Sequence, residues 1–324
     1  MDSRVLLFPA KLAAFVGRYV ARYFEKGRFT PTPTPYLSIE TTNICNSDCV
    51  FCANSVMKRK KGYIDDGDFE AAVEDFAKNG GTKIDFNVTI GDPLLDKRLM
   101  QRARYVRQFP QFKTLGFVTT LQWLHKKDLD EFLELFTWVS VSITLSGRDS
   151  YRKFFGVDKY DDALSNLKML LKAVHERKSS FEVVISIKPT PESVQEICSH
   201  PDFIEVNELY GGGLEADVGA RAFYADDWLG AVKLPDYIKR RPLYPRAFRP
   251  CSILYGKLMV FSNGKVSACS CRDFEASGDL IIGDIRTDKI MDLWRGDRLK
   301  AIRKDWRLRN KVPDTCRSCR HYVY

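Results

Sequence analysis

The segment 37–52, LSIETTNICNSDCVFC, decides how the rest of the chain is interpreted. Its first half, Leu37–Thr42, is rich in apolar and β-branched residues and predicts a buried strand. Its second half places Cys45, Cys49 and Cys52 on the loop after that strand. Three thiolates alone cannot complete a tetrahedral zinc site, whereas a four-iron cubane held by three cysteines keeps one iron open. The spacing therefore favours an iron–sulfur cluster, with incidental loop cysteines or zinc completed by a distant residue as the alternatives.

Strand and helix patterns alternate from this segment to about residue 210. Apolar residues of Asp65–Asn79 recur every three to four positions, as in an amphipathic helix, whereas Trp138–Leu145 alternates like a half-buried strand. The other predicted strands are Lys83–Ile90, Thr114–Thr120, Phe181–Lys188 and Phe203–Leu209, and the other predicted helices are Asp96–Gln108, Lys127–Phe136, Asp161–Glu176 and Pro191–Ser199. Six strand–helix repeats predict an α/β fold, a parallel sheet curled into a partial (β/α)6 TIM-like barrel.

The carboxyl ends of the strands are where such barrels carry their chemistry. The segments predicted there are the cysteine loop, Gly91-Asp92-Pro93, Ser146-Gly147, Lys188-Pro189 and Tyr210-Gly211-Gly212-Gly213. We expect the last of these, with Glu215 and Asp217 behind it, to shape the mouth of a substrate site.

The loop Cys45-x-x-x-Cys49-x-Phe51-Cys52 resembles the signature of the radical S-adenosylmethionine (SAM) superfamily, and the resemblance extends over about residues 36–210. It implies that the three cysteines hold a [4Fe–4S] cluster whose open iron is chelated by SAM, with Phe51 near the adenine. One-electron reduction would cleave SAM to methionine and a 5′-deoxyadenosyl radical, which abstracts hydrogen from a substrate. A flavodoxin- or ferredoxin-type protein is the expected reductant.

Three further segments resemble the SAM-binding motifs of that family. Gly91-Asp92-Pro93 is similar to a Gly-Gly-Glu-Pro segment that holds the SAM amino group, with the shorter Asp92 in place of the glutamate. Thr144 keeps a hydroxyl near the end of the fourth strand, and Lys188 ends the fifth strand, where the family contacts SAM. A plain structural role is the alternative for Thr144 and for Lys188.

A second group of cysteines lies near the C-terminus. Cys251, Cys269, Cys316 and Cys319 could supply four thiolates to a metal centre. Ser262-Asn263-Gly264, between the predicted strands Lys257–Phe261 and Lys265–Ala268, is a hairpin signal that places Cys269 just beyond a turn. A helix is predicted for Ile290–Asp305.

This arrangement resembles the SPASM and twitch auxiliary domains of radical SAM enzymes. The resemblance implies one auxiliary [4Fe–4S] cluster, with structural zinc as the alternative, and the shorter twitch type fits because no cysteine follows Cys319 in this sequence. Cys271 belongs to neither group and is an alternative ligand, an inert thiol or a hydrogen-atom donor facing the substrate. Cys198 is predicted to be buried packing.

The predicted organisation has four parts. Residues 1–35 form a basic amphipathic helix, Arg4 to Lys26, and a proline-rich linker; residues 36–220 form the barrel; residues 221–250 form a bridging segment; and residues 251–324 form the auxiliary cluster domain. The helix has too short an apolar run to span a bilayer, so we expect it to pack on the domain or to contact a partner or an anionic membrane weakly.

The 324 residues include 51 Lys and Arg against 42 Asp and Glu, a net charge of +9. No aromatic RNA-recognition signature and no zinc-finger spacing accompany this charge, so we expect no nucleic-acid partner. The densest basic run, Lys58-Arg59-Lys60-Lys61, is predicted to be a solvated loop. Nine cysteines cannot all pair within the chain, and without a secretory signal they indicate metal ligands and a cytoplasmic location.

The expected reaction is hydrogen abstraction from a carbinol C–H of a sugar, cyclitol or similar polyol, because only the short basic helix precedes the barrel and no peptide-recognition domain does. The auxiliary cluster would take an electron for oxidation, or the Cys271 thiol would return hydrogen for epimerisation. The alternatives are epimerisation or crosslinking of a ribosomally made peptide, and a non-catalytic metal-bound scaffold.

Overall fold

The computed structural model describes residues 29–177, 179–188, 190–221, 224–241, 251–270, 272–308 and 311–321. The predicted basic helix and Cys271 lie outside these ranges. Within them, no helix combines the length and the apolar character that crossing a bilayer requires.

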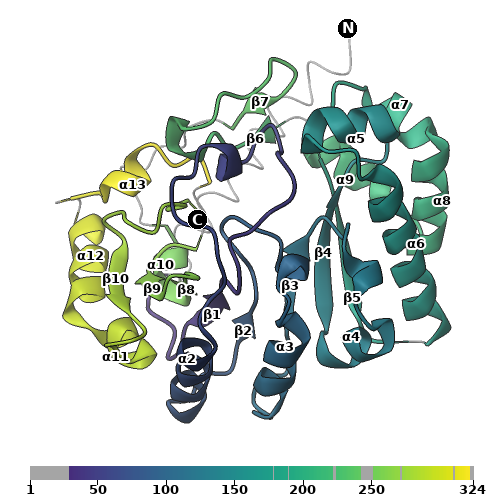
Figure 1. Cartoon of the computed structure of the whole chain (residues 1–324). Helices are drawn as coiled ribbons and strands as arrows, with labels where there is room; N and C mark the ends of the chain where they lie inside the picture. The colour runs from purple at the N-terminus through teal and green to yellow at the C-terminus, as the bar shows by residue number, and fades with distance from the viewer. Residues whose placement is uncertain are drawn as a thin grey trace, which may run out of the picture.

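Two sheets carry the fold (Figure 1). One has the order β10-β9-β8-β1-β2 and the other the order β3-β4-β5 with all pairs parallel. The Phe86 N–H, just after β2, donates to the Gly116 carbonyl of β3 at 3.0 Å, so the second sheet continues the first. The strands are β1 Tyr36–Ile39, β2 Ile84–Asp85, β3 Gly116–Thr119, β4 Trp138–Ile143, β5 Glu182–Ile187, β8 Lys257–Val260, β9 Lys265–Ser267 and β10 Ile281–Asp284, with a separate pair of β6 Tyr224–Ala225 and β7 Lys239–Arg240.

Helices cover the outside of these strands, with α6 and α8 at one edge of the molecule and α11 and α12 at the other (Figure 1). They are α2 Asp66–Lys78, α3 Leu99–Arg107, α4 Leu129–Leu135, α5 Arg148–Phe155, α6 Tyr160–Glu176, α7 Val194–Ser199, α8 Pro201–Tyr210, α9 Leu214–Arg221, α10 Ile253–Gly256, α11 Ile290–Arg295, α12 Asp297–Arg307 and α13 Asp314–Arg317. The result is the predicted α/β partial barrel.

Local sequence explains helix α2, which begins and ends where its residues predict. The Asp65 carboxylate accepts a hydrogen bond from the Asp68 N–H, satisfying one of the free donors of the first turn. The helix buries Phe69, Val73 and Phe76 against the sheet and ends at Asn79 before two glycines.

The hairpin of the C-terminal unit forms as predicted and also joins the barrel sheet. Strands β8 and β9 are antiparallel around residues 262–264, as the turn signal predicts. Strand β8 also pairs in parallel with β1, Leu258 opposite Leu37. One apolar core therefore runs from the barrel into the C-terminal unit and includes Trp294 and Leu299.

The predicted strand Phe203–Leu209 is wrong, because this segment is helix α8. Pro201 occupies the first turn, where its missing N–H costs nothing, and Phe203 and Val206 are buried three residues apart on one face. Gly211, with φ +95°, ends the helix in the left-handed conformation that glycine adopts easily. No strand from this segment is therefore added next to β5 in the described sheets, whereas β8 pairs in parallel with β1 at the opposite edge.

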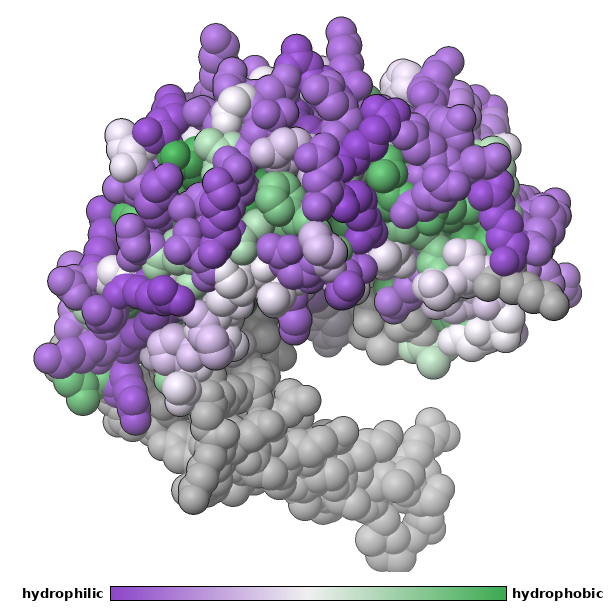
Figure 2. All heavy atoms as spheres, turned by 90° about the horizontal axis from the view of Figure 1, so that it is seen from below, coloured by the Kyte–Doolittle hydropathy of each residue, from purple (hydrophilic) through white to green (hydrophobic). Residues whose placement is uncertain are grey.

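Two other elements differ from their predictions. The predicted helix Ile290–Asp305 is broken at Gly296 into α11 and α12, and α5 was not predicted at all. The face of the molecule seen from below is mainly hydrophilic with small apolar patches (Figure 2), as a chain with 29% charged residues should be.

Candidate functional site

The cysteine loop lies at the carboxyl end of β1 and is held in place through its backbone. The N–H groups of Asp48 and Val50 donate to the carbonyls of Phe155 and Phe154, both at 2.9 Å. The Ile44 carbonyl accepts from the backbone of the neighbouring segment 91–93 at 2.9 Å. The unpredicted helix α5 thus fixes the loop from one side and the segment 91–93 from the other.

Two glycines let these neighbours approach the loop. A Cβ on Gly156, where φ is +70°, would lie 2.4 Å from the Asp48 carbonyl oxygen. A Cβ on Gly91, where φ is +133°, would lie 2.6 Å from the Thr42 carbonyl oxygen. Real Cβ atoms do not come this close, so glycine is required at both positions. Gly91 therefore has a packing role against the loop, next to its predicted SAM contact.

The three thiols of the loop share a buried environment. Burial raises the pKa of Cys45 to about 12, with the nearby Asp92 and Cys52 charges adding to the effect. Burial also raises the pKa of Cys49 and of Cys52, and Cys49 feels the charges of the two other cysteines. Thiols in such a place ionise when a bound cation stabilises the thiolate, so this donor set fits a metal cluster.

The Asp92 carboxylate is buried and saturated by protein donors. Its oxygens accept from the Thr119 hydroxyl at 2.8 and 3.0 Å, from the Thr120 N–H at 3.0 Å and hydroxyl at 2.8 Å, and from the Leu94 N–H at 3.1 Å. This network ties segment 91–93 to the end of β3. A contact of the Asp92 side chain with SAM stays a prediction. The backbone of Pro93 offers little for such a contact, because proline has no N–H and the Pro93 carbonyl accepts from the Asp96 N–H at 2.9 Å.

Thr144 and Lys188 lie where parallel strands end. Thr144 follows β4 and is fully buried, and among the described residues its hydroxyl has no hydrogen-bond partner, as a group that meets a ligand would have. Lys188 follows β5; its Nζ donates to the Ser186 hydroxyl at 2.8 Å, and its positive charge favours the thiolate of Cys49. Both positions fit a bound SAM.

A cavity of about 390 Å³ opens beside the loop. Phe51 stacks on Phe154 with ring centroids 5.0 Å apart, and the Trp228 indole donates to the Phe51 carbonyl at 2.7 Å. Basic and aromatic side chains dominate the lining, which consists of Phe51, Thr89, Phe154, Ser186, Ile187, Lys188, Tyr224, Ala225, Asp226, Trp228, Arg241, Arg272 and His321. The segment predicted to be a mere bridge, 221–250, therefore supplies part of the wall.

The expected mouth residues are not in this lining. Gly211 to Gly213 end helix α8, Tyr210 is exposed, and Glu215 accepts a hydrogen bond from Asn207 at 2.8 Å. The Asp217 side chain lies outside the described part of the chain. The strand on which the prediction for 210–213 and Glu215 depended is a helix, and none of these residues lines this cavity.

The four C-terminal cysteines line one small apolar pocket. Its walls are Cys251, Ile253, Leu254, Ala268, Cys269, Leu280, Trp306, Cys316, Cys319 and His321. In the described ranges, no three Cys, His, Asp or Glu side chains lie close enough to share one metal ion. The cysteines of a cubane bind different irons, so the fit rests on the donor set, four thiols with an apolar lining. His321 lines both this pocket and the larger cavity.

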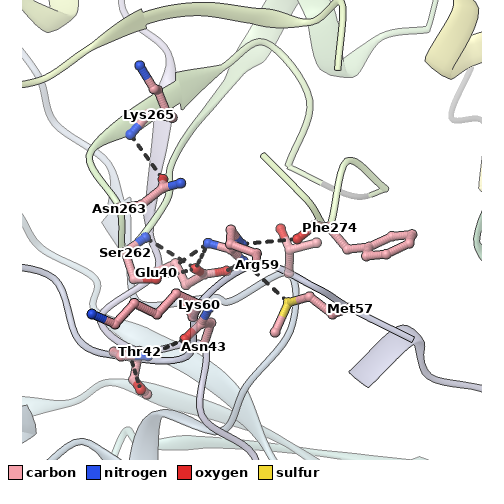
Figure 3. Close-up of polar contacts among 12 residues, drawn as sticks. Glu40, Thr42, Asn43, Met57, Arg59, Lys60, Ser262, Asn263, Lys265 and Phe274 are labelled. Carbon is pink, nitrogen blue, oxygen red and sulfur yellow. Dashed lines mark hydrogen bonds and ion pairs between the residues drawn. The ribbon is translucent and has the colours of Figure 1, made fainter. Parts of the chain in front are cut away.

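The basic run 58–61 is not uniformly solvated, because Arg59 is buried. Its guanidinium pairs with both oxygens of Glu40, at 2.6 and 3.0 Å, and donates to the Phe274 carbonyl at 3.1 Å (Figure 3). Glu40 also accepts from the Ser262 N–H at 3.1 Å and from the Ser262 hydroxyl at 2.8 Å. Glu275 accepts from the backbone N–H groups of residues 58 and 59, both at 2.8 Å. This Arg59 clamp joins the segment after the cysteine loop to the C-terminal unit.

Four residues at the site were not predicted from the sequence: Glu40, Glu275, Asp226 and Trp228. No local sequence pattern marks such residues, because their partners are distant in the chain. Glu40, for example, pairs with Arg59 and Ser262, about 20 and 220 residues away. The one available signal was Glu40 itself, a charged residue in an otherwise apolar strand.

Comparison with known protein families gives two matches. The radical SAM superfamily matches residues 39–200, and the iron–sulfur cluster-binding domain called SPASM matches residues 251–320. Among curated proteins, a probable GTP 3',8-cyclase of Saccharolobus islandicus is 24% identical over 280 residues, 81% of this chain and 86% of that protein. The GTP 3',8-cyclase of Pasteurella multocida is 24% identical over 146 residues, which cover only 44% of this chain and 42% of that enzyme.

Solved structures show the same fold. BtrN in complex with AdoMet and 2-DOIA superposes with a TM-score of 0.60 at 18% identity, over 90% of this chain and 94% of BtrN. Streptococcus suis SuiB bound to the precursor peptide SuiA superposes with a TM-score of 0.61 at 14% identity, over 96% of this chain and 74% of SuiB.

Proposed function

Because the chain belongs to the radical SAM superfamily and carries a SPASM iron–sulfur domain, we propose that it abstracts hydrogen from a carbinol C–H of a sugar, cyclitol or similar polyol. The cofactors of such an enzyme are a [4Fe–4S] cluster with SAM and an auxiliary iron–sulfur cluster. When bound, SAM and its cluster supply a 5′-deoxyadenosyl radical. Membership of this family favours an enzyme over the alternative of a non-catalytic metal-bound scaffold.

The geometry supports the following assignment of the residues that hold these groups. Cys45, Cys49 and Cys52 hold the SAM-binding cluster, and the pocket formed by Cys251, Cys269, Cys316 and Cys319 holds the auxiliary cluster. Phe51, the backbone of 91–93, Thr144 and Lys188 surround SAM. Asp92 positions segment 91–93 through its contacts with β3.

One observation favours oxidation over epimerisation: His321 lines both the cavity beside the cysteine loop and the four-cysteine pocket. Loss of a hydrogen atom from R₂CH–OH leaves R₂C•–OH, which becomes R₂C=O when it loses one proton and one electron. An electron acceptor must therefore lie near the substrate, and His321 borders both the four-cysteine pocket and the cavity. Epimerisation would instead require a hydrogen atom from a thiol, for which Cys271 remains the candidate.

Isotope transfer tests this proposal. The anaerobically reconstituted protein would be incubated with SAM, dithionite and polyols deuterated at their carbinol carbons, and the mass of 5′-deoxyadenosine would be measured. We expect deuterium in 5′-deoxyadenosine and a ketone product. A flavodoxin- or ferredoxin-type protein, the proposed natural reductant, would replace dithionite as a control.

The alternatives give different results in the same assay. Cleavage of SAM without deuterium transfer from any polyol would overturn the polyol proposal. Deuterium transfer from a labelled peptide would then support the peptide alternative, since SuiB was solved with a precursor peptide. GTP belongs in the set of substrates because two relatives carry the name GTP 3',8-cyclase.

A further inference from the structure

Asp226 stands out in the wall of the cavity. It follows β6, is only 5% exposed and lines the cavity beside Trp228. Its Oδ1 accepts the Trp228 backbone N–H at 2.8 Å and pairs with Arg272 Nε at 2.7 Å. Within the described residues, Oδ2 has no hydrogen-bond partner. A buried acceptor left open in this way is costly, and the cavity is where a ligand could satisfy it.

Two other buried carboxylates at this end of the barrel, Asp92 and Glu40, are satisfied by the protein. Both oxygens of Asp92 accept hydrogen bonds from threonines, and those of Glu40 pair with Arg59. Asp227 also has an open oxygen, Oδ1, but it is not among the cavity-lining residues, and its Oδ2 pairs with Arg240 and Arg320. Asp226 alone combines an open oxygen with a place in the described cavity wall.

Charge and position narrow what Asp226 can bind. The Arg272 guanidinium balances its charge and lies over the Trp228 ring, 4.4 Å from the centroid. Trp228 in turn donates to the Phe51 carbonyl in the cysteine loop. A balanced carboxylate does not need a cationic ligand and readily accepts from a neutral hydroxyl. Lys188 and Arg241 add positive charge to the same wall, which disfavours an ammonium group further.

We propose that Asp226 Oδ2 accepts a hydrogen bond from a hydroxyl group of the substrate and thereby selects a hydroxylated molecule. This inference rests on the proposed function and names a specificity residue for it. Because Trp228 ties Asp226 to the cysteine loop, the hydroxyl is held on the same side of the cavity as Phe51.

Binding to the unreduced, SAM-loaded and reconstituted protein tests the proposal without turnover. The probes are myo-inositol, glucose and GTP, with single-deoxy analogues of the tightest binder, and isothermal titration gives the affinities. Asp226→Asn keeps the shape and an oxygen for Trp228 and Arg272, but it turns the open acceptor into an N–H donor. Asp227→Asn is the matched control, an adjacent buried carboxylate outside the cavity.

We expect Asp226→Asn to weaken the tightest probe about 10- to 100-fold, as for hydrogen bonds to charged groups, with SAM affinity and cluster absorbance unchanged. One deoxy analogue should bind the wild type more weakly than the parent probe does. Asp226→Asn should bind that analogue and the parent probe with equal affinity. Equal affinities for wild type and Asp226→Asn, a similar loss in Asp227→Asn, or no binding of any probe by the wild type would overturn the inference. Binding that depends on Asp226 without deuterium transfer would instead leave the inference standing and contradict the proposed reaction.

Discussion

Replacing Arg59 by methionine removes the cation from a buried ion pair while keeping most of the side-chain volume. The Arg59 side chain is 4% exposed and that of Glu40 is 0% exposed. After the substitution, Glu40 would retain only the two donors of Ser262. The guanidinium also lies 4.9 Å from the Phe261 ring centroid and donates to Phe274.

The expected destabilisation is about 3–5 kcal/mol, the usual result of leaving one member of a buried pair without its partner. The double variant Arg59→Met/Glu40→Gln removes the stranded charge and should recover a large part of that loss. Glu275→Gln should cost less, about 1 kcal/mol, because the one glutamine oxygen still accepts from one of the two backbone N–H groups of 58 and 59 and the site is partly solvated.

Anaerobic urea unfolding of the reconstituted protein, followed by near-ultraviolet circular dichroism and by cluster absorbance, measures these differences. Both signals should move to lower urea together, since the Arg59 clamp joins the segment behind the cysteine loop to the C-terminal unit. A loss below about 1 kcal/mol for Arg59→Met, or a double variant no more stable than the single one, would show that the Arg59–Glu40 pair does not stabilise the fold in this way.

Other changes have equally defined outcomes. Gly156→Ala should destabilise the protein and lower its content of the SAM-binding cluster, because the new Cβ would lie 2.4 Å from the Asp48 carbonyl oxygen. Gly212→Ala, which has a similar positive φ but open space around it, should cost only about 1 kcal/mol. Iron counting and thermal unfolding compare the two variants, and equal effects would contradict a packing role for Gly156. Hydrogen bonding by Arg286 holds the pKa of Asp284 below its ordinary value, so this contribution is present above about pH 4 and is lost as the pH falls further. Arg286→Gln should therefore lower stability by roughly 0.5–1 kcal/mol at pH 7, discounted for the exposed arginine, and a thermal unfolding difference that persists undiminished at pH 3 would contradict this.

The sequence predicted the parts of the molecule that short-range patterns determine. The cysteine loop, helix α2 and the hairpin around residues 262–264 depend on spacing, capping and turn residues that are adjacent in the chain. Helix α8 was missed because Phe203–Leu209 mixes apolar and polar residues in a way that suits both periods, and Pro201 and Gly211 decided between them.

The rest of the site depends on contacts between distant segments. Arg59 is buried only because Glu40 and the backbone near residue 274 meet it, and Asp226 borders the cavity only because Arg272 and Trp228 hold it there. Charge runs and isolated acids have no periodicity that reports such partners, so their roles become visible only in the folded chain.

The iron content of the reconstituted protein tests most directly whether the two sets of cysteines hold two separate clusters. We expect about eight irons per chain for the wild type, and about four each for the loop variant Cys45→Ala/Cys49→Ala/Cys52→Ala and the pocket variant Cys316→Ala/Cys319→Ala. Of the two variants, only the pocket variant should still cleave SAM when a reductant is added. A wild type with about four irons and one zinc, or a loop variant that keeps all its iron, would contradict this placement.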